Sequence, residues 1–380
     1  MIISLSYFLL FLTLICFGSW SNIRVYTCLQ GANFSLFYIV GQVIISALFF
    51  SLYSIFLFDS QSIKQGLTVH TIAFGLSSGF SSALADFLVA CSCARISPTI
   101  SFPAYAGVGL ITGSTLNLVI ETKVPINLIY FCFGIFFAMV AIFLISFSGK
   151  YRTKSTGQYP DPTGTNNQQQ IQVDLDNYHI LYFNHETICL KGSTSIEQKL
   201  EYEGENFGSN KFNSFIWIML SLFAGTITGL WSPLLALSTS PNQNVIQIAL
   251  LFYSGQLASV PVIILLFTQV IARMDDERKG IFFQDFLSVT IHCSRQDKLI
   301  SVVCGLLVGL GYSLYFLFFR VISSSISFAV AACCPLVSLF IAVFLKRELV
   351  HAPFVKVALV TGTALSFIIA ISFLLTAREV

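Results

Sequence analysis

Ten stretches of the sequence contain about 20 consecutive, mostly apolar residues, the length an α-helix needs to cross a bilayer. They lie at residues 2–20, 34–58, 69–93, 100–120, 126–147, 214–237, 245–271, 299–319, 324–345 and 354–376. Only 10% of the residues are charged and 55% are apolar. Soluble domains carry about 25% charged residues, because a surface facing water needs them. The sequence therefore predicts a multi-pass integral membrane protein whose main partner is the lipid bilayer.

These stretches should be helices rather than the strands of a barrel. A transmembrane barrel strand alternates apolar and polar residues, and residues 8–12 (FLLFL) do not alternate. A helix pairs every backbone N–H and C=O within its own segment, as lipid demands. The first stretch could instead be a cleaved signal peptide, although it has no basic start and its apolar run is long for one. We therefore expect an all-α membrane protein with ten transmembrane helices.

The distribution of Lys and Arg predicts the orientation, because these residues prefer the cytosolic side of a membrane. Ten spans place both termini on one side, with only 4 of the 20 Lys and Arg residues: Lys64, Lys123, Arg320 and Arg378. The other 16 lie on the opposite side, together with the long connection 148–213. We therefore expect non-cytosolic termini and a cytosolic central loop, mostly disordered because it is polar. We expect the plasma membrane rather than an internal membrane.

Short matches between the two halves indicate an internal repeat. Trp20 and Trp231 both stand in a Gly-x-Trp-Ser frame, 211 residues apart. A Gly-x-x-x-Gly pattern recurs in the third and eighth stretches, and a Ser-Phe pair and a terminal Glu recur in the fourth and ninth. The matched residues are Gly75 and Gly79 with Gly305 and Gly309, Ser101 and Phe102 with Ser327 and Phe328, and Glu121 with Glu348. Gly-x-x-x-Gly alone is common where membrane helices pack closely, so the shared order carries the inference.

Each half contains five stretches, an odd number, so the second half must cross the bilayer in the opposite sense. The prediction is two inverted five-helix repeats, residues 1–147 and 214–380, joined by the loop 148–213. This architecture is typical of secondary transporters, whose substrate site lies at the repeat interface near the bilayer midplane.

Several short motifs, in the same order, resemble the ureide permease family of the drug/metabolite transporter superfamily. They are residues 16–20 (CFGSW), 113–117 (GSTLN), 231–233 (WSP), 305–311 (GLLVGLG) and 334–338 (CPLVS). The resemblance implies a ten-helix secondary transporter of allantoin, uracil, xanthine or related oxo-nitrogen heterocycles, coupled to protons. Plant members carry a phosphate-loop-like motif in the central loop. Here the nearest stretch, residues 190–194 (LKGST), lacks the glycine cradle before the lysine, so we expect no nucleotide and no other cofactor.

Polar residues inside the spans are the candidates for a substrate site, because a charge in the bilayer is costly and is retained for function. Asp86 is the one carboxylate well inside a span, and we interpret it as a proton-coupling and substrate-binding acid. The alternative is a carboxylate that only joins helices. The full set of candidates is Trp20, Asp86, Asn117, Trp231, Gln256, Tyr312, Tyr315 and Arg320.

For each candidate an ordinary structural role is the alternative. The two tryptophans could stack on a planar heterocycle or belong to an interfacial aromatic belt. Arg320 could bind a carbonyl of the substrate or extend to the interface. Tyr312 and Tyr315 stand where the family would have smaller or amide residues, which leaves the substrate open. Pro233 should break or loosen its helix. We expect Glu121 to form a solvated pair at the span end with Lys123.

Other function classes fit the sequence less well. None of the five histidines lies near a span centre and there is no His-Glu-x-x-His motif, so an intramembrane metalloprotease is disfavoured and no metal site is expected. A receptor or channel does not explain a doubled five-helix unit. A sugar or nucleotide-sugar carrier of the same superfamily remains the alternative substrate class. We expect no nucleic-acid partner, and a homodimer stays open.

Overall fold

The computed structural model describes residues 2–24, 26–27, 29, 31–57, 68–93, 98–121, 126–148, 211–239, 245–271, 283–345 and 352–378. The helices in these ranges are α1 (Ile2–Arg24), α2 (Gly31–Leu57), α3 (Val69–Cys93), α4 (Pro98–Ile120), α5 (Leu128–Ser148), α7 (Lys211–Ser238), α8 (Val245–Leu266), α10 (Phe283–His292), α11 (Arg295–Ile322), α12 (Ser324–Ala331), α13 (Pro335–Phe340) and α14 (Phe354–Thr376). Two short π-helices, η2 (Phe267–Ile271) and η4 (Ile341–Leu345), extend α8 and α13. Most of the predicted central loop, residues 149–210, lies outside the described residues.

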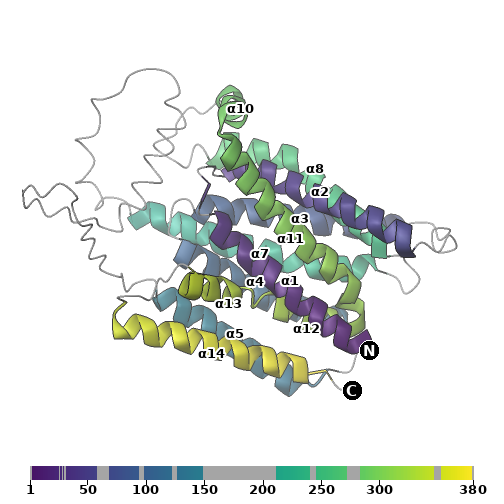
Figure 1. Ribbon diagram of the computed structural model, residues 1–380, viewed down its shortest axis with the longest axis vertical. Coiled ribbons are helices and arrows are strands. Elements are labelled where there is room, and N and C mark those ends of the chain that lie inside the picture. The colour runs from purple at the N-terminus through teal and green to yellow at the C-terminus, as the bar shows by residue number, and fades with distance from the viewer. Residues whose placement is uncertain are drawn as a thin grey trace, which may run out of the picture.

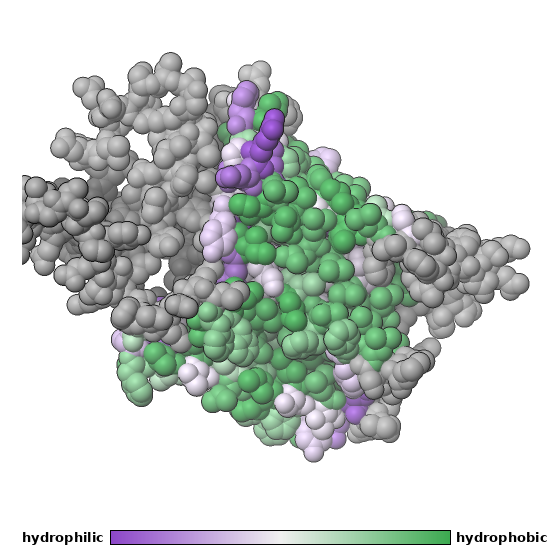
Figure 2. Space-filling view, in the orientation of Figure 1, coloured by the Kyte–Doolittle hydropathy of each residue, from purple (hydrophilic) through white to green (hydrophobic). Residues whose placement is uncertain are grey.

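Eight of the described helices, α1, α3, α4, α5, α7, α8, α11 and α14, contain segments long and apolar enough to cross a bilayer. Two shorter apolar segments, Asn33–Leu48 and Ser324–Phe340, coincide with the remaining two predicted spans. Large apolar side chains such as Phe133 and Phe136 on α5 and Ile368 on α14 are exposed. Figure 2 shows one face of the bundle covered almost continuously with apolar residues. The chain is thus an all-helical, multi-pass membrane protein.

The ninth predicted span, 324–345, is not one continuous helix. A turn at residues 332–334 separates α12 from α13. Pro335 begins α13, at the position of a helix where its missing N–H costs no hydrogen bond. Pro233 does not interrupt its helix, because α7 runs through it to Ser238. The prediction was that Pro233 breaks or loosens its helix, and the break is wrong. The break before Pro335 was not predicted.

Helices of the first half pack mainly against helices of the second half. α1 and α2 lie on α11, α3 lies between α7 and α8, α4 lies on α7, and α5 pairs with α14 (Figure 1). α5 and α14 run antiparallel, since Ile126 bridges to Arg378 and the N–H of Asn127 donates to the carbonyl of Ala377 at 2.7 Å. The beginning of α1 and the end of α14 lie at the same end of the bundle (Figure 1).

Two close helix crossings depend on glycines and have the same pattern of contacts. On α11, a Cβ at Gly305 would overlap the carbonyl of Tyr38 on α2. On α3, a Cβ at Gly79 would overlap the carbonyl of Phe252 on α8. In return, Gly41 of α2 faces the carbonyl of Val302 on α11, and Gly255 of α8 faces the carbonyl of Leu76 on α3. Small residues allow these backbones to touch, which is how membrane helices pack without a hydrophobic driving force.

These contacts pair Gly79 with Gly305, a separation of 226 residues. The sequence comparison had paired Gly75 with Gly305, a separation of 230 and therefore one helical turn away. The reason is that a Gly-x-x-x-Gly pattern matches itself after a shift of four residues. Only the facing helix decides which glycine occupies the crossing.

Candidate functional site

Asp86 lies in the middle of the bundle and is buried, with 9% of its surface exposed. It belongs to α3, whose many Gly, Ser and Ala residues allow neighbouring helices to approach closely. Its Oδ2 accepts a hydrogen bond from the hydroxyl of Tyr38 on α2 at 3.0 Å. Its Oδ1 accepts one from the hydroxyl of Tyr105 on α4 at 3.1 Å. Each carboxyl oxygen therefore has one phenol donor, and the two donors come from different helices.

Hydroxyl groups from the second half complete this cluster. Thr228 on α7 shares a hydrogen bond with the hydroxyl of Tyr105, at 2.9 Å between their oxygens. Tyr312 on α11 shares one with Ser82 at 2.6 Å. Ser82 lies one turn before Asp86 on α3, so it is on the same helix face. We call Asp86, Tyr38, Tyr105, Thr228, Ser82 and Tyr312 the Asp86 cluster.

No cation compensates Asp86 among the residues that the structure describes: its hydrogen bonds there come from two neutral phenols. A single ionised group inside a bilayer costs about 2.5–3.5 kcal/mol even on insertion scales, and neutral donors offset only part of that cost. The site therefore favours binding of a species that neutralises the charge of the carboxylate. A proton does so directly, which makes this arrangement suitable for reversible proton binding.

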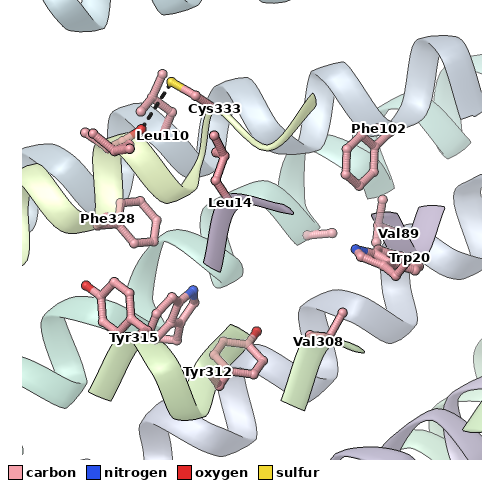
Figure 3. Close-up of a cluster of buried hydrophobic side chains, with 14 of the residues drawn as sticks. Leu14, Trp20, Val89, Phe102, Leu110, Val308, Tyr312, Tyr315, Phe328 and Cys333 are labelled. Carbon is pink, nitrogen blue, oxygen red and sulfur yellow. Dashed lines mark hydrogen bonds between the residues drawn. The ribbon is translucent and has the colours of Figure 1, made fainter. Parts of the chain in front are cut away.

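The two tryptophans are buried in the core and do not form an exposed interfacial belt. The ring of Trp20 packs against Tyr38, with ring centroids 5.6 Å apart, and against Phe102 at 6.0 Å. The ring of Trp231 packs against Phe252 at 5.9 Å and Phe328 at 5.7 Å, and also against Tyr312 and Tyr315 at 5.2 and 5.0 Å. Figure 3 shows Trp20 beside Val89 and Phe102, and Phe328 beside Tyr315.

The two tryptophan surroundings correspond position by position. Phe102 and Phe328 are 226 residues apart, as are the donors to the two tryptophan carbonyls, Ser78 and Cys304. Ser78 Oγ lies 2.6 Å from the carbonyl oxygen of Trp231, and Cys304 Sγ lies 3.6 Å from that of Trp20. The same separation relates Asp86 to Tyr312. Asp86 is bonded to Tyr38, which packs on Trp20, whereas Tyr312 packs directly on Trp231.

A second polar network lies along α4, α7 and α11. Asn117 Nδ2 donates to Ser232 Oγ at 2.9 Å, and Ser232 Oγ lies 3.0 Å from the hydroxyl of Tyr315. The Tyr315 hydroxyl also reaches the carbonyl of Ser324 at 3.5 Å, where α12 begins. The predicted residues Asn117 and Tyr315 therefore meet through one serine, although not at Asp86.

Glu121, directly after α4, holds the beginning of α12. Its carboxylate accepts the N–H groups of Ser324 and Ser325 at 2.9 and 3.0 Å, and the hydroxyl of Ser323 at 2.7 Å. Ser323 has a φ of 155°, a conformation that side-chain-bearing residues rarely adopt, and it separates α11 from α12. A negative charge suits the N-terminus of a helix. Glu121 is therefore engaged with α12 and is not simply a solvated end residue. Its predicted partner Lys123, and also Glu348, lie outside the described residues.

Gln256, another predicted site residue, makes no hydrogen bond to the Asp86 cluster among the described residues. Gln256 is fully buried on α8, and neither atom of its amide has a hydrogen-bond partner among the described residues. Gln42 on α2, 214 residues earlier, has the same unsatisfied amide. Arg320 belongs to α11, but its side chain lies outside the described residues.

Sequence reasoning missed Tyr38, Tyr105 and Thr228. A single Tyr or Thr in an apolar helix has no special pattern, and its partner here comes from another helix.

Comparisons with protein-family models, with curated proteins and with solved structures gave no match for this chain.

Proposed function

We propose that this protein is a proton-coupled secondary transporter of small oxo-nitrogen heterocycles such as uracil, xanthine or allantoin. Its Asp86 cluster would bind the proton and the substrate. The observation that carries the proposal is a buried carboxyl group held by two phenols, with no cation beside it among the described residues. Hydroxyl groups of α7 and α11, from the second half, join the same cluster. The substrate class itself rests on the resemblance to the ureide permeases.

The architecture that we propose is two inverted five-helix repeats, in which α2 is the second span and the α12–α13 pair is the ninth. The equivalent crossings at Gly79 and Gly305 support this arrangement. So does the antiparallel pairing of α5 with α14, the last helix of each half, because equivalent helices of inverted repeats run in opposite directions. In this arrangement the proposed site would lie at the interface of the two repeats, near the bilayer midplane.

Transport by alternating access would expose the Asp86 cluster to one side of the membrane at a time. Binding of a proton makes the carboxyl group neutral, so the loaded site can be carried past apolar helices at lower cost. The breaks at Ser323 and before Pro335 give the α12–α13 segment places where it can bend. We further propose that the central loop is cytosolic and that the protein resides in the plasma membrane.

Uptake into proteoliposomes tests this function. Purified protein would be reconstituted and given labelled uracil, xanthine or allantoin, with the outside more acidic than the inside. We expect accumulation that stops when a protonophore collapses the gradient. Unlabelled oxo-purines should compete, and sugars should not. Accumulation of a sugar instead would support the alternative carrier class, and the absence of uptake for every heterocycle at every gradient would refute the proposal.

A further inference from the structure

The hydrogen bonds that Asp86 already makes limit what else it can bind. A carboxyl group offers about four lone-pair positions, two on each oxygen. The hydroxyls of Tyr38 and Tyr105 use one position on each oxygen. One position on each oxygen remains, so an ionised Asp86 offers a ligand two acceptors. A protonated Asp86 instead offers one donor, the acid O–H, and one acceptor, the acid C=O.

The surroundings of Asp86 favour the neutral form while the site is closed. The titratable groups that face it are the phenols of Tyr38 on α2, Tyr105 on α4 and Tyr312 on α11, and the thiol of Cys334 before α13. All four carry no charge when protonated. α7 and α8, which also pack on α3, bring no charged side chain to it among the described residues. Burying an unpaired charge here would cost more than burying a hydrogen-bonded neutral acid.

We infer that protonated Asp86 recognises the lactam edge of the substrate, where a ring N–H stands beside a ring C=O. This inference rests on the proposed transport function. The acid O–H donates to the ring carbonyl, and the acid C=O accepts the ring N–H, so two hydrogen bonds form at once. The ionised form would place an oxygen lone pair of Asp86 against the oxygen of the ring carbonyl, and the two acceptors would repel each other. Proton and substrate therefore bind together, which makes the protein a symporter for rings with a free N–H.

Neighbouring aromatic side chains would act on the substrate either by holding Asp86 or by stacking on the ring. Tyr38 and Tyr105 are positioning residues, because their hydroxyls hold the carboxyl group from two sides. Trp20 packs on Tyr38 and Phe102 and lies where a planar ring could stack after these side chains part. The closed site buries Asp86, so the substrate enters in another conformation.

The test is equilibrium binding of labelled uracil to the purified full-length protein at several pH values. For wild type, affinity should fall with rising pH by at most about tenfold per unit, as one linked proton requires. A ring whose N–H groups are methylated should bind about tenfold or more weakly at low pH, because both hydrogen bonds are lost or misplaced. Tighter binding at high pH, or equal binding of the methylated ring, would overturn the inference without any variant.

Asp86→Asn gives the sharper arm, because an amide presents a donor beside an acceptor at every pH. It should bind uracil with an affinity within about threefold of wild type at low pH, and without pH dependence, whereas Asp86→Ala should bind about tenfold or more weakly. Asp297→Asn is the matched control. Asp297 is also a buried carboxylate that accepts two hydroxyl donors, from Thr27 and Ser294, but at the beginning of α11. It should keep the wild-type pH dependence.

The outcomes separate the two proposals. If wild type binds none of the heterocycles at any pH, the proposed function fails. If wild type binds them but Asp86→Asn, shown to be folded by its elution and melting temperature, binds none, the lactam pairing fails while the transport function stands. Loss of pH dependence in Asp297→Asn would move the proton site away from Asp86 and would also overturn the inference.

Discussion

Gly79 on α3 lies directly against the main-chain carbonyl of Phe252 on α8, and Gly305 on α11 lies in the same way against the carbonyl of Tyr38 on α2. Tyr38 is also a donor to Asp86, and Phe252 packs on Trp231. The two glycine crossings therefore hold both sides of the candidate site in register.

Gly79→Ala or Gly305→Ala should destabilise the protein, because the added methyl group would overlap a backbone carbonyl that cannot rotate away. Overpacking of this kind costs about 1–3 kcal/mol. Thermal unfolding in detergent, followed by the loss of the monodisperse chromatographic peak, measures the effect. Gly362→Ala is the control: on α14 the new methyl group would meet only Leu144 Cδ1 at 3.4 Å, and alanine gains about 1 kcal/mol in helix propensity. Equal melting temperatures for Gly305→Ala and Gly362→Ala would contradict the crossing.

Glu121→Ala should weaken the start of α12, because the N–H groups of Ser324 and Ser325 lose their acceptor. Leaving such buried donors unsatisfied costs about 1–3 kcal/mol, visible as a lower melting temperature. Glu121→Gln keeps an acceptor and should lose less. Ser325→Ala, which removes one hydroxyl donor at 2.9 Å and leaves the N–H groups paired, should have the smallest effect. If all three variants melted like wild type, Glu121 would be no more than a solvated end residue.

Tyr105→Phe should reduce uptake about tenfold at low substrate concentration, because a hydrogen bond to a carboxyl group and the link to Thr228 disappear together. Tyr253→Phe is matched in chemistry: the Tyr253 hydroxyl bonds to the carbonyl of Gly309 and to Ser313, away from Asp86. It should affect stability more than uptake. The vesicles of the two variants must contain equal amounts of folded protein. A larger uptake defect in Tyr253→Phe than in Tyr105→Phe would argue against the Asp86 cluster as the site.

Epitope tags on the two termini should be on the same face of the membrane, and a tag inserted in the central loop should be on the opposite face. The reason is that the first five spans take the chain to the opposite face, where the central loop lies, and the next five bring it back. Protease protection of intact cells and of permeabilised cells measures this. We expect the terminal tags to be cleaved from outside and the loop tag only after permeabilisation. Termini on opposite faces would rule out the inverted repeat.

The sequence by itself determined that this protein lies in a lipid bilayer and which segments cross it. Hydropathy is a sum over the residues of a segment and does not depend on their neighbours in space. The predicted spans 69–93 and 354–376 therefore have the same bounds as α3 and α14, Val69–Cys93 and Phe354–Thr376. Asp86 could be singled out in the same way, because a lone carboxylate in an apolar stretch is visible without knowing its neighbours.

Tertiary structure alone decided which side chains meet. Tyr38 and Tyr105 reach Asp86 because of the rotation and register of three helices, and a hydrogen bond between helices leaves no pattern in any one of them. The partner of Glu121 could not be predicted from the sequence either, because a charged residue at a helix end can face solvent or the N-terminus of a neighbouring helix. Hydrophobicity is additive along a chain, whereas hydrogen bonds and close contacts depend on direction, so only the packed bundle specifies them.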